Sequence, residues 1–168
     1  ILGGIKALNK GMSSFCKVDS RMYGAAYIPF NFGEDVALSF LREAIKDNFS
    51  VILIDTIAPG GCKAFTHPDF DVVWQEVQNA DIAVTLHVGA DNGWDPVPIS
   101  FYNNNSSVPS HKAGDAPRDA LAYMGISYNA ELFLASMIFD GVLERFPKLR
   151  IGVIELGASF VCKVLNTK

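Results

Sequence analysis

The sequence predicts an α/β fold in which a parallel sheet is covered by helices. Four short apolar segments, rich in β-branched or aromatic residues, alternate with segments whose apolar residues recur at helical spacing. The strand-like segments are nearly continuous apolar runs, which is typical of strands covered on both faces. The 168 residues include 49% hydrophobic and 19% charged side chains, so the chain has the composition of a globular protein with a real core.

Four strands are predicted from these apolar runs. The first spans residues 22–30 and is expected to end at Pro29, because proline cannot donate to a sheet ladder. The second and third are buried strands over residues 50–55 and 82–88, and the fourth covers residues 151–155. Strands that alternate with helices in this way indicate βαβ units.

Two helices are predicted between the first three strands. Glu34 and Asp35 put negative charge where a helix N-terminus favours it. The apolar stripe that follows them is Ala37, Leu38, Leu41, Ala44 and Ile45. The second helix is expected to begin near Thr66, since Thr66 and Asp69 form a pattern similar to a capping box. Its apolar stripe is Phe70, Val73, Trp74 and Val77.

A long loop and a third helix are predicted between the last two strands. Residues 90–118 are rich in Asn, Pro and Ser and have no sustained period. A helix is expected from about Asn129 and ends at Pro147. One face of this helix is expected to carry Ala135, Ile138, Phe139, Val142 and Phe146.

Two architectures fit this element order, the eight-fold barrel and the open doubly wound sheet. The first strand–helix turn, residues 31–33, lacks the Gly-x-Gly-x-x-Gly pattern of a dinucleotide-binding sheet, which favours the barrel. A complete barrel needs about 250 residues. We therefore predict a partial (β/α)8 TIM-like barrel with parallel strands and outer helices, a single domain over residues 1–168 that is truncated at both ends. Its open strand edge leads us to expect poor solubility or homo-oligomers of this fragment.

Charge and composition exclude several classes of partner. The formal net charge is -4 and no Lys/Arg cluster is present, so nucleic acid is not an expected partner. No apolar run reaches the roughly 20 residues that span a bilayer, so no membrane partner is expected. Cys16, Cys62 and Cys162 are widely spaced, which favours free thiols and a cytoplasmic location.

Three polar residues end predicted strands, where parallel α/β folds place their active sites: Asp55, His87 and Glu155. His87 alternates with Ala83 and Thr85, so we expect it to face the barrel interior. An imidazole there is a good Zn²⁺ ligand, and a carboxylate on a neighbouring strand completes such a site or activates water. The alternatives are a metal-free histidine hydrogen-bonded at the rim and an Asp55 that only caps a loop. Glu155 is costly to bury without a partner.

Other polar or aromatic residues have plainer interpretations. His67 is expected at the start of a helix, and His111 is expected to be exposed in the polar loop. Trp94 follows the third strand and either lines a pocket or covers the barrel rim.

Three segments resemble the metal-dependent amidohydrolase superfamily, in particular the branch that includes aminocarboxymuconate-semialdehyde decarboxylase. They are His67-Pro-Asp-Phe-Asp-Val-Val-Trp74, Val84-Thr-Leu-His-Val-Gly89, and the distinctive block from Phe133 to Gly157, which contains Phe-Pro-Lys-Leu-Arg. With the spacing between them, these segments cover most of the chain from about Tyr23 onward.

The resemblance implies a distorted eight-stranded barrel that holds one divalent metal ion, usually zinc. By this resemblance His87 is a metal ligand, and Glu155 stands where many relatives carry a proton-handling histidine. Glu155 would act as acid/base catalyst, bind the metal, or mark a branch with different chemistry. The family's His-x-His pair has no counterpart in residues 1–21, and its late aspartate would lie beyond Lys168.

The expected function is that of a metal-dependent hydrolase or nonoxidative decarboxylase (carboxy-lyase) with a small organic substrate. The fragment alone is expected to be inactive because two ligand-bearing segments are missing. A non-catalytic barrel homologue that serves as a binding or scaffold protein is the alternative. A metal-free lyase that forms a Schiff base would need a lysine at a strand end, and none of the four predicted strands supplies one.

Overall fold

The computed structural model of the chain describes residues 1–56, 63–87, 127–158 and 161–162. These residues form a four-stranded parallel sheet in the order β1-β2-β3-β4, so that each strand pairs with the next one in sequence. The strands are β1 (Ala25–Tyr27), β2 (Val51–Leu53), β3 (Ala83–His87) and β4 (Arg150–Ile154). The predicted parallel α/β fold is confirmed.

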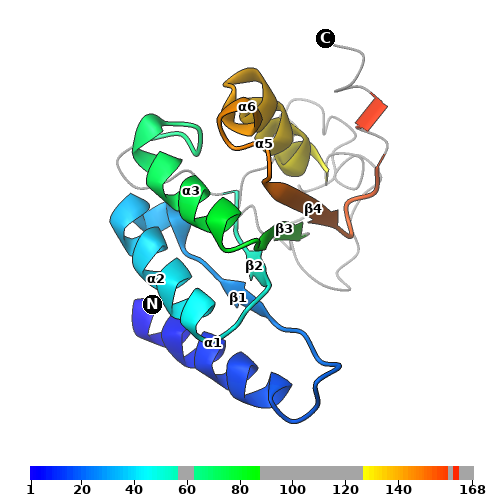
Figure 1. The fold of residues 1–168 in the computed structure, drawn as a ribbon. Coiled ribbons are helices and arrows are strands. Elements are labelled where there is room, and N and C mark those ends of the chain that lie inside the picture. Colours follow the sequence, from blue (N-terminus) through cyan, green and yellow to red (C-terminus); the bar gives the residue numbers. More distant parts are fainter. Residues whose placement is uncertain (57–62, 88–126, 159–160, 163–168) are drawn as a thin grey trace, which may run out of the picture.

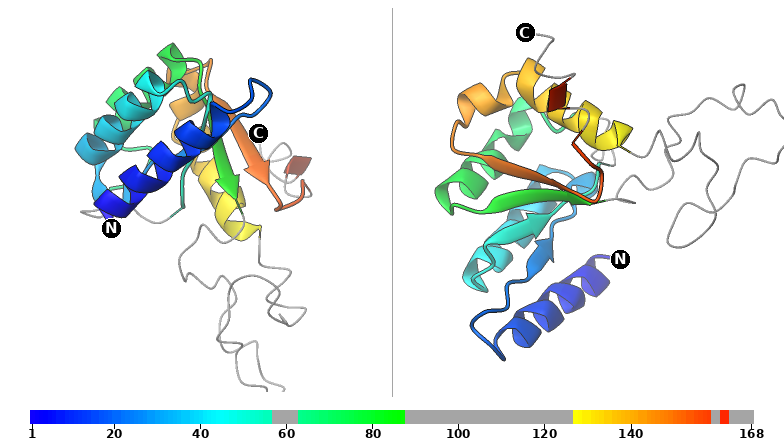
Figure 2. Two further views of the ribbon diagram at one scale, coloured as in Figure 1. Left: turned by 90° about the horizontal axis from the view of Figure 1, so that it is seen from below. Right: turned by 90° about the vertical axis from the view of Figure 1, so that its right-hand side faces the viewer.

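Helices lie between the strands along the chain (Figure 1). The α-helices are α1 (Leu2–Cys16), α2 (Glu34–Lys46), α3 (Asp71–Asn79), α5 (Tyr128–Phe139) and α6 (Val142–Arg145), and the short 3-10 helices are η1 (Phe30–Phe32) and η3 (Pro68–Phe70). Helices α2 and α3 pack side by side (Figure 2). Acidic residues begin both helices, as the macrodipole favours.

One face of the sheet is buried under helices. Its side chains are Ala26, Ile28, Ile52, Ile54, Val84 and Leu86, none of which is more than 1% exposed. An aromatic group packs nearby, where the ring of Phe30 lies 5.6 Å from that of Phe70 and 5.1 Å from that of Trp74. The predicted stripe of α3 is fully buried, and most of the stripe of α2 is buried as well.

The opposite face of the sheet carries a different set of side chains. The register places Tyr27 beside Leu53, Leu53 beside Thr85, and Thr85 beside Gly152. Because side chains alternate along a strand, these four residues share one face. This face corresponds to the barrel interior, and it leads to the carboxyl ends of the strands.

The first strand is shorter than the sequence predicted. β1 contains three residues rather than the expected nine, and the chain turns into η1 directly after Pro29. The last three strands begin and end within two residues of their predicted bounds wherever the structure describes them.

Helix α1 was not predicted from the sequence. Gly3, Gly4 and Gly11 lie within it, and each lowers intrinsic helix propensity by about 1 kcal/mol. The side chain of Asn9 on this helix donates to the Tyr27 carbonyl and accepts from the Tyr27 amide, both at 2.9 Å. It therefore covers the outer edge of β1 at Tyr27, part of the edge that we expected to be open.

The predicted third helix is in fact two helices. Gly141 adopts a left-handed backbone conformation (φ 72°) between α5 and α6, which suits glycine and breaks the helix. The predicted buried face is confirmed at Val142 and Phe146, which are 0% and 5% exposed, and it is wrong at Phe139, which is 60% exposed. The buried apolar residues of α5 are Ala130, Phe133 and Met137.

The predicted capping box at Thr66 is wrong. The Thr66 hydroxyl donates to Asp140 Oδ2 at 2.6 Å, so a carboxylate on a distant turn replaces the local backbone partner. The cap of η3 is His67, whose Nδ1 accepts from the Asp69 amide at 3.2 Å. His67 thus begins a helix, as predicted.

Two further findings concern membrane-spanning helices and the cysteines. None of the described helices combines the length and the apolar character needed to cross a membrane. Cys16 and Cys162 are free thiols, and Cys62 lies outside the described residues.

Candidate functional site

The carboxyl ends of β3 and β4 bring His87 and Glu155 together. His87 is the last residue of β3 and pairs in register with Ile154, so Glu155 follows one residue beyond its neighbour. The distance from His87 Nε2 to Glu155 Oε2 is 3.4 Å. The side chains are 42% and 63% exposed, respectively. The two predicted site residues therefore form a pair that solvent can reach.

Glu155 has an unusual backbone conformation. Its φ of 63° lies in the left-handed region, which costs free energy for a residue with a Cβ. β4 ends just before it. Residues held in such conformations occur often at ligand-binding positions. Because Glu155 is exposed, the expected cost of burying its carboxylate does not arise in this structure.

A second polar pair lies at the ends of β1 and β2. Asp55 is 4% exposed, and its Oδ2 accepts a hydrogen bond from the Tyr27 hydroxyl. Burial, followed by the contact with the Asp55 carboxylate, raises the pKa of Tyr27 above its ordinary value. Tyr27 is consequently a protonated donor across the physiological pH range.

The two pairs share one face of the sheet. Leu53 lies beside Thr85, and Asp55 and His87 each follow two residues later, so the strand alternation directs both toward the barrel interior. Thr85, between the pairs, is buried, and its hydroxyl donates to the Ile52 carbonyl at 2.8 Å. The mouth of the partial barrel is therefore polar at the ends of all four strands.

A separate charged cluster lies on the loops beside α2 and η3. Lys63 Nζ contacts Glu34 at 2.8 Å and Asp69 at 2.5 Å. The hydrogen bond with Lys63 lowers the pKa of each carboxyl group, and the two carboxylates raise the pKa of Lys63. His67 belongs to this cluster, not to the mouth, with Nδ1 3.5 Å from Asp69. His111 and Trp94 lie outside the described residues.

The ligand set for a metal ion is incomplete in the described part of the chain. Among residues 1–56, 63–87, 127–158 and 161–162, no three His, Cys, Asp or Glu side chains are close enough to hold a metal ion together. His87 and Glu155 form a pair of such groups. A complete site would need at least one further ligand.

Comparison with solved structures shows which fold this sheet belongs to. An amidohydrolase from Mycobacterium avium subsp. paratuberculosis matches with a TM-score of 0.68 and 20% identity over 85% of this chain. The apo form of IDCase from Metarhizium anisopliae gives 0.66 and 15% over 90%, and 2,6-dihydroxybenzoate decarboxylase from Rhizobium gives 0.61 and 17% over 90%. The chain has the fold of part of an amidohydrolase barrel.

This likeness is one of fold, since all three identities are below 25%. The chain spans 34%, 37% and 44% of the three amidohydrolase-fold structures, respectively, which is the extent of a partial barrel. No family model matches the sequence, and no curated protein matches it either. The predicted partial barrel is thus confirmed, while the chemistry of the whole protein has to be argued from the site.

The sequence analysis missed one polar residue of the mouth, Tyr27. Its signal was present, because Tyr27 precedes Pro29 by two residues and alternates with Ala25 at the end of a predicted strand. A tyrosine in an aromatic-rich strand is commonly a packing residue, and it is the hydrogen bond from its hydroxyl to Asp55 Oδ2 that makes Tyr27 part of the polar mouth.

Proposed function

We propose that this chain is part of a metal-dependent hydrolase or nonoxidative decarboxylase that acts on a small organic substrate at the barrel mouth. In this proposal His87 is a ligand of a divalent ion, with zinc as the expected metal. Glu155 supports that site as a second ligand or as an acid/base group. The fold, which this chain shares with amidohydrolases and decarboxylases, supports the general class.

The observation that carries the proposal is the contact between His87 and Glu155. Two ligands of one tetrahedral zinc ion, each about 2.0–2.2 Å from the metal, lie about 3.4 Å from each other. The distance from His87 Nε2 to Glu155 Oε2 is 3.4 Å. The pair therefore fits as two of the ligands of one ion, with both side chains open to solvent.

The residues of the mouth have separate tasks in this proposal. When bound, a divalent ion supplies Lewis-acid polarisation of a substrate carbonyl or carboxylate. Glu155 can accept or return a proton beside the reacting group, because its carboxylate is exposed and next to an imidazole. Tyr27 holds the Asp55 carboxylate in place through its hydroxyl, so that a fixed negative charge faces the same mouth.

The alternative is a non-catalytic barrel homologue with a binding or scaffold role. It would need no metal, and the comparisons do not favour it. Zinc affinity distinguishes the two functions, because in a scaffold protein the substitution of His87 would not change zinc binding.

The decisive measurement is zinc affinity by isothermal titration calorimetry on the full-length protein, in its wild-type form and as His87→Ala, because the described residues do not provide a complete ligand set. We expect about one zinc ion per chain, and an affinity at least about tenfold weaker in His87→Ala, since even residues that only orient metal ligands are worth 10–100-fold. The matched control is His67→Ala, because this histidine is similarly exposed but belongs to the separate cluster around Lys63.

Equal affinities in the wild type and His87→Ala would remove His87 from the site. A wild-type full-length protein without zinc affinity would overturn the metal role proposed for these residues. Glu155→Gln separates the two roles of the carboxylate. If it acts chiefly as a proton carrier, zinc affinity changes little, whereas a ligand role predicts a loss similar to that of His87→Ala.

A further inference from the structure

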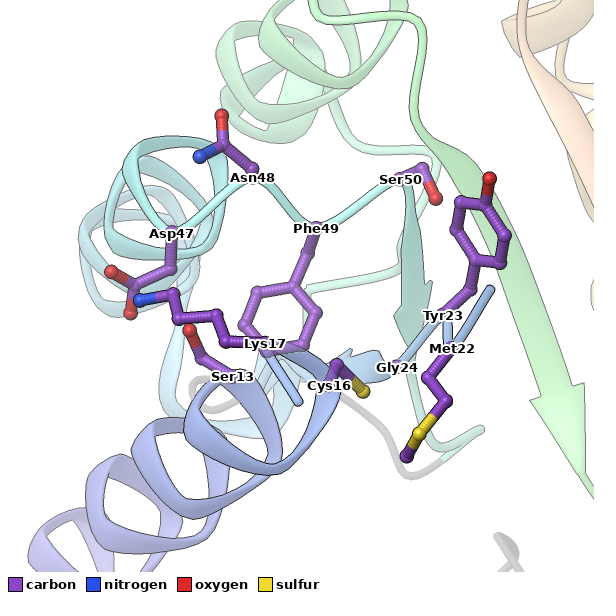
Figure 3. A pocket seen from close by; sticks show the side chains of 10 residues that line it. All are labelled: Ser13, Cys16, Lys17, Met22, Tyr23, Gly24, Asp47, Asn48, Phe49 and Ser50. Carbon is purple, nitrogen blue, oxygen red and sulfur yellow. The ribbon is translucent and has the colours of Figure 1, made fainter. Parts of the chain in front are cut away.

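A pocket lies at the opposite end of the sheet from His87 and Glu155. It has a volume of about 200 Å³ and is formed where α1 ends and where the chain enters β1 and β2 (Figure 3). Its lining includes Cys16, Met22, Gly24 and Phe49. These residues are at the amino ends of the strands, so this pocket is separate from the barrel mouth.

Three sulfur-bearing side chains lie in or beside this pocket, with Cys16 and Met22 in its lining and Met12 in contact with Cys16. Met12 and Cys16 are one turn apart on α1, and the distance between Met12 Sδ and Cys16 Sγ is 3.9 Å. Met22 comes from the segment before β1, and its side chain lines the same pocket as Cys16. Figure 3 shows the sulfur ends of Cys16 and Met22 on the same side of the pocket.

Gly24 leaves space for these sulfur atoms. A Cβ at this position would lie 2.6 Å from Met12 Cγ, 3.0 Å from Cys16 Sγ and 3.1 Å from Met12 Sδ. The φ of Gly24 is not in the left-handed region, so the backbone conformation alone does not require glycine here. The absence of a side chain at Gly24 is what lets the thiol and the thioether approach the strand.

We propose that Met12, Cys16 and Met22 form a binding site for a soft monovalent metal ion, with Cu(I) as the preferred ion. Thiolate and thioether sulfurs select Cu(I) over harder cations. With metal–sulfur distances of about 2.3 Å, two ligands of a trigonal ion lie about 4 Å apart, close to the 3.9 Å between Met12 Sδ and Cys16 Sγ. On binding, the Cys16 thiol releases its proton to solvent and coordinates as the thiolate.

The surroundings favour this ion over zinc. The pocket lining contains no histidine, and its one carboxylate is Asp47. Lys17, which also lines the pocket, adds a positive charge that opposes a divalent cation more than a monovalent one. A site with one thiolate and two neutral thioethers suits a monovalent soft ion.

The test is an anaerobic titration with Cu(I) in competition with a chromophoric Cu(I) chelator. The chain carries Cys62→Ser and Cys162→Ser, so that Cys16 is its single thiol. We expect one Cu(I) per chain, and an affinity at least about tenfold weaker when Met12→Leu or Met22→Leu is added. Leucine conserves the volume of methionine, so these variants should fold normally, which circular dichroism would check. Cys16→Ser should abolish the binding.

Two controls separate a built site from a reactive thiol. Gly24→Ala should weaken Cu(I) binding, whereas Gly11→Ala, with nothing within 4 Å of its added Cβ, should leave it unchanged. His87→Ala should also leave it unchanged, so the outcome is independent of the proposed zinc site. Equal affinity in both leucine variants and the parent chain would show a lone thiol and overturn the proposal. If the chelator removes all Cu(I) from the parent chain, the proposal is also overturned.

Discussion

Two polar pairs stand at the same edge of the sheet, and they differ chiefly in their exposure to solvent. Asp55 is 4% exposed and is held by the Tyr27 hydroxyl. His87 and Glu155 are in contact on the next two strands, but their side chains are 42% and 63% exposed. The first pair resembles a core contact, and the second resembles a site that is open to a ligand.

Because of this difference in exposure, we expect the two pairs to contribute differently to the stability of the fold and to ligand binding. A hydrogen bond to a buried carboxylate cannot be replaced by water, so removing its donor is costly. An exposed ion pair is screened by water and contributes little to folding. We therefore expect the Tyr27–Asp55 pair to matter for stability and the His87–Glu155 pair to matter for binding.

The largest stability effect is expected for Tyr27→Phe. The substitution keeps the ring and removes only the hydroxyl that donates to the buried Asp55 carboxylate. We expect the free energy of unfolding to fall by about 1.5–3 kcal/mol, as for hydrogen bonds to charged groups. Urea denaturation measures this. Tyr23→Phe is the matched control, since that side chain is 80% exposed and should change stability little. An equal effect of the two variants would contradict the structural role of the buried pair.

The same pair predicts an alkaline loss of stability. Burial and the Asp55 carboxylate raise the pKa of Tyr27 in the folded state, so the folded chain keeps the phenolic proton when the unfolded chain has released it. Stability is therefore complete below the ordinary tyrosine pKa of about 10 and falls above it, by up to about 1.4 kcal/mol per pH unit. Unfolding measured from pH 9 to 11 should show this slope in the wild type and a shallower slope in Tyr27→Phe. The same slope in both would assign the alkaline loss to other groups.

The sequence analysis predicted helix α3 and missed helix α1, and the two helices differ in their glycine content. The predicted stripe is fully buried, with Phe70 at the end of η3 and Val73, Trp74 and Val77 in α3, because a buried helix face requires that spacing. Helix α1 contains three glycines, so its local propensity argues against a helix although packing against β1 stabilises one. Local patterns thus predict an element only where propensity and tertiary packing agree.

The candidate site could be predicted in part. The rule that strand ends carry polar groups placed Asp55, His87 and Glu155 at one edge of the sheet. Which of them pair depends on the register that aligns His87 with Ile154 and on the left-handed backbone of Glu155. Neither is encoded in a short motif, because register results from the packing of whole strands. The partner of Asp55 was missed for the same reason.

The smallest change in stability is expected from a substitution in the exposed pair of His87 and Glu155. Glu155→Gly removes an exposed carboxylate and also relieves the left-handed backbone (φ 63°), so it should raise the free energy of unfolding by about 0.5–1 kcal/mol. Asn48→Gly relieves a similar conformation (φ 62°) in a loop and should gain less, because asparagine tolerates this region better.

Zinc affinity is expected to change in only one of these two variants. Glu155→Gly should bind zinc more weakly if the carboxylate is a ligand, whereas Asn48→Gly should bind it as the wild type does. A gain in stability together with a loss of affinity would mean that the backbone of Glu155 is strained in order to keep its carboxylate beside His87. A loss of stability in Glu155→Gly would instead make the exposed pair a structural contact like that of Tyr27 and Asp55, and the contrast between the two pairs would fail.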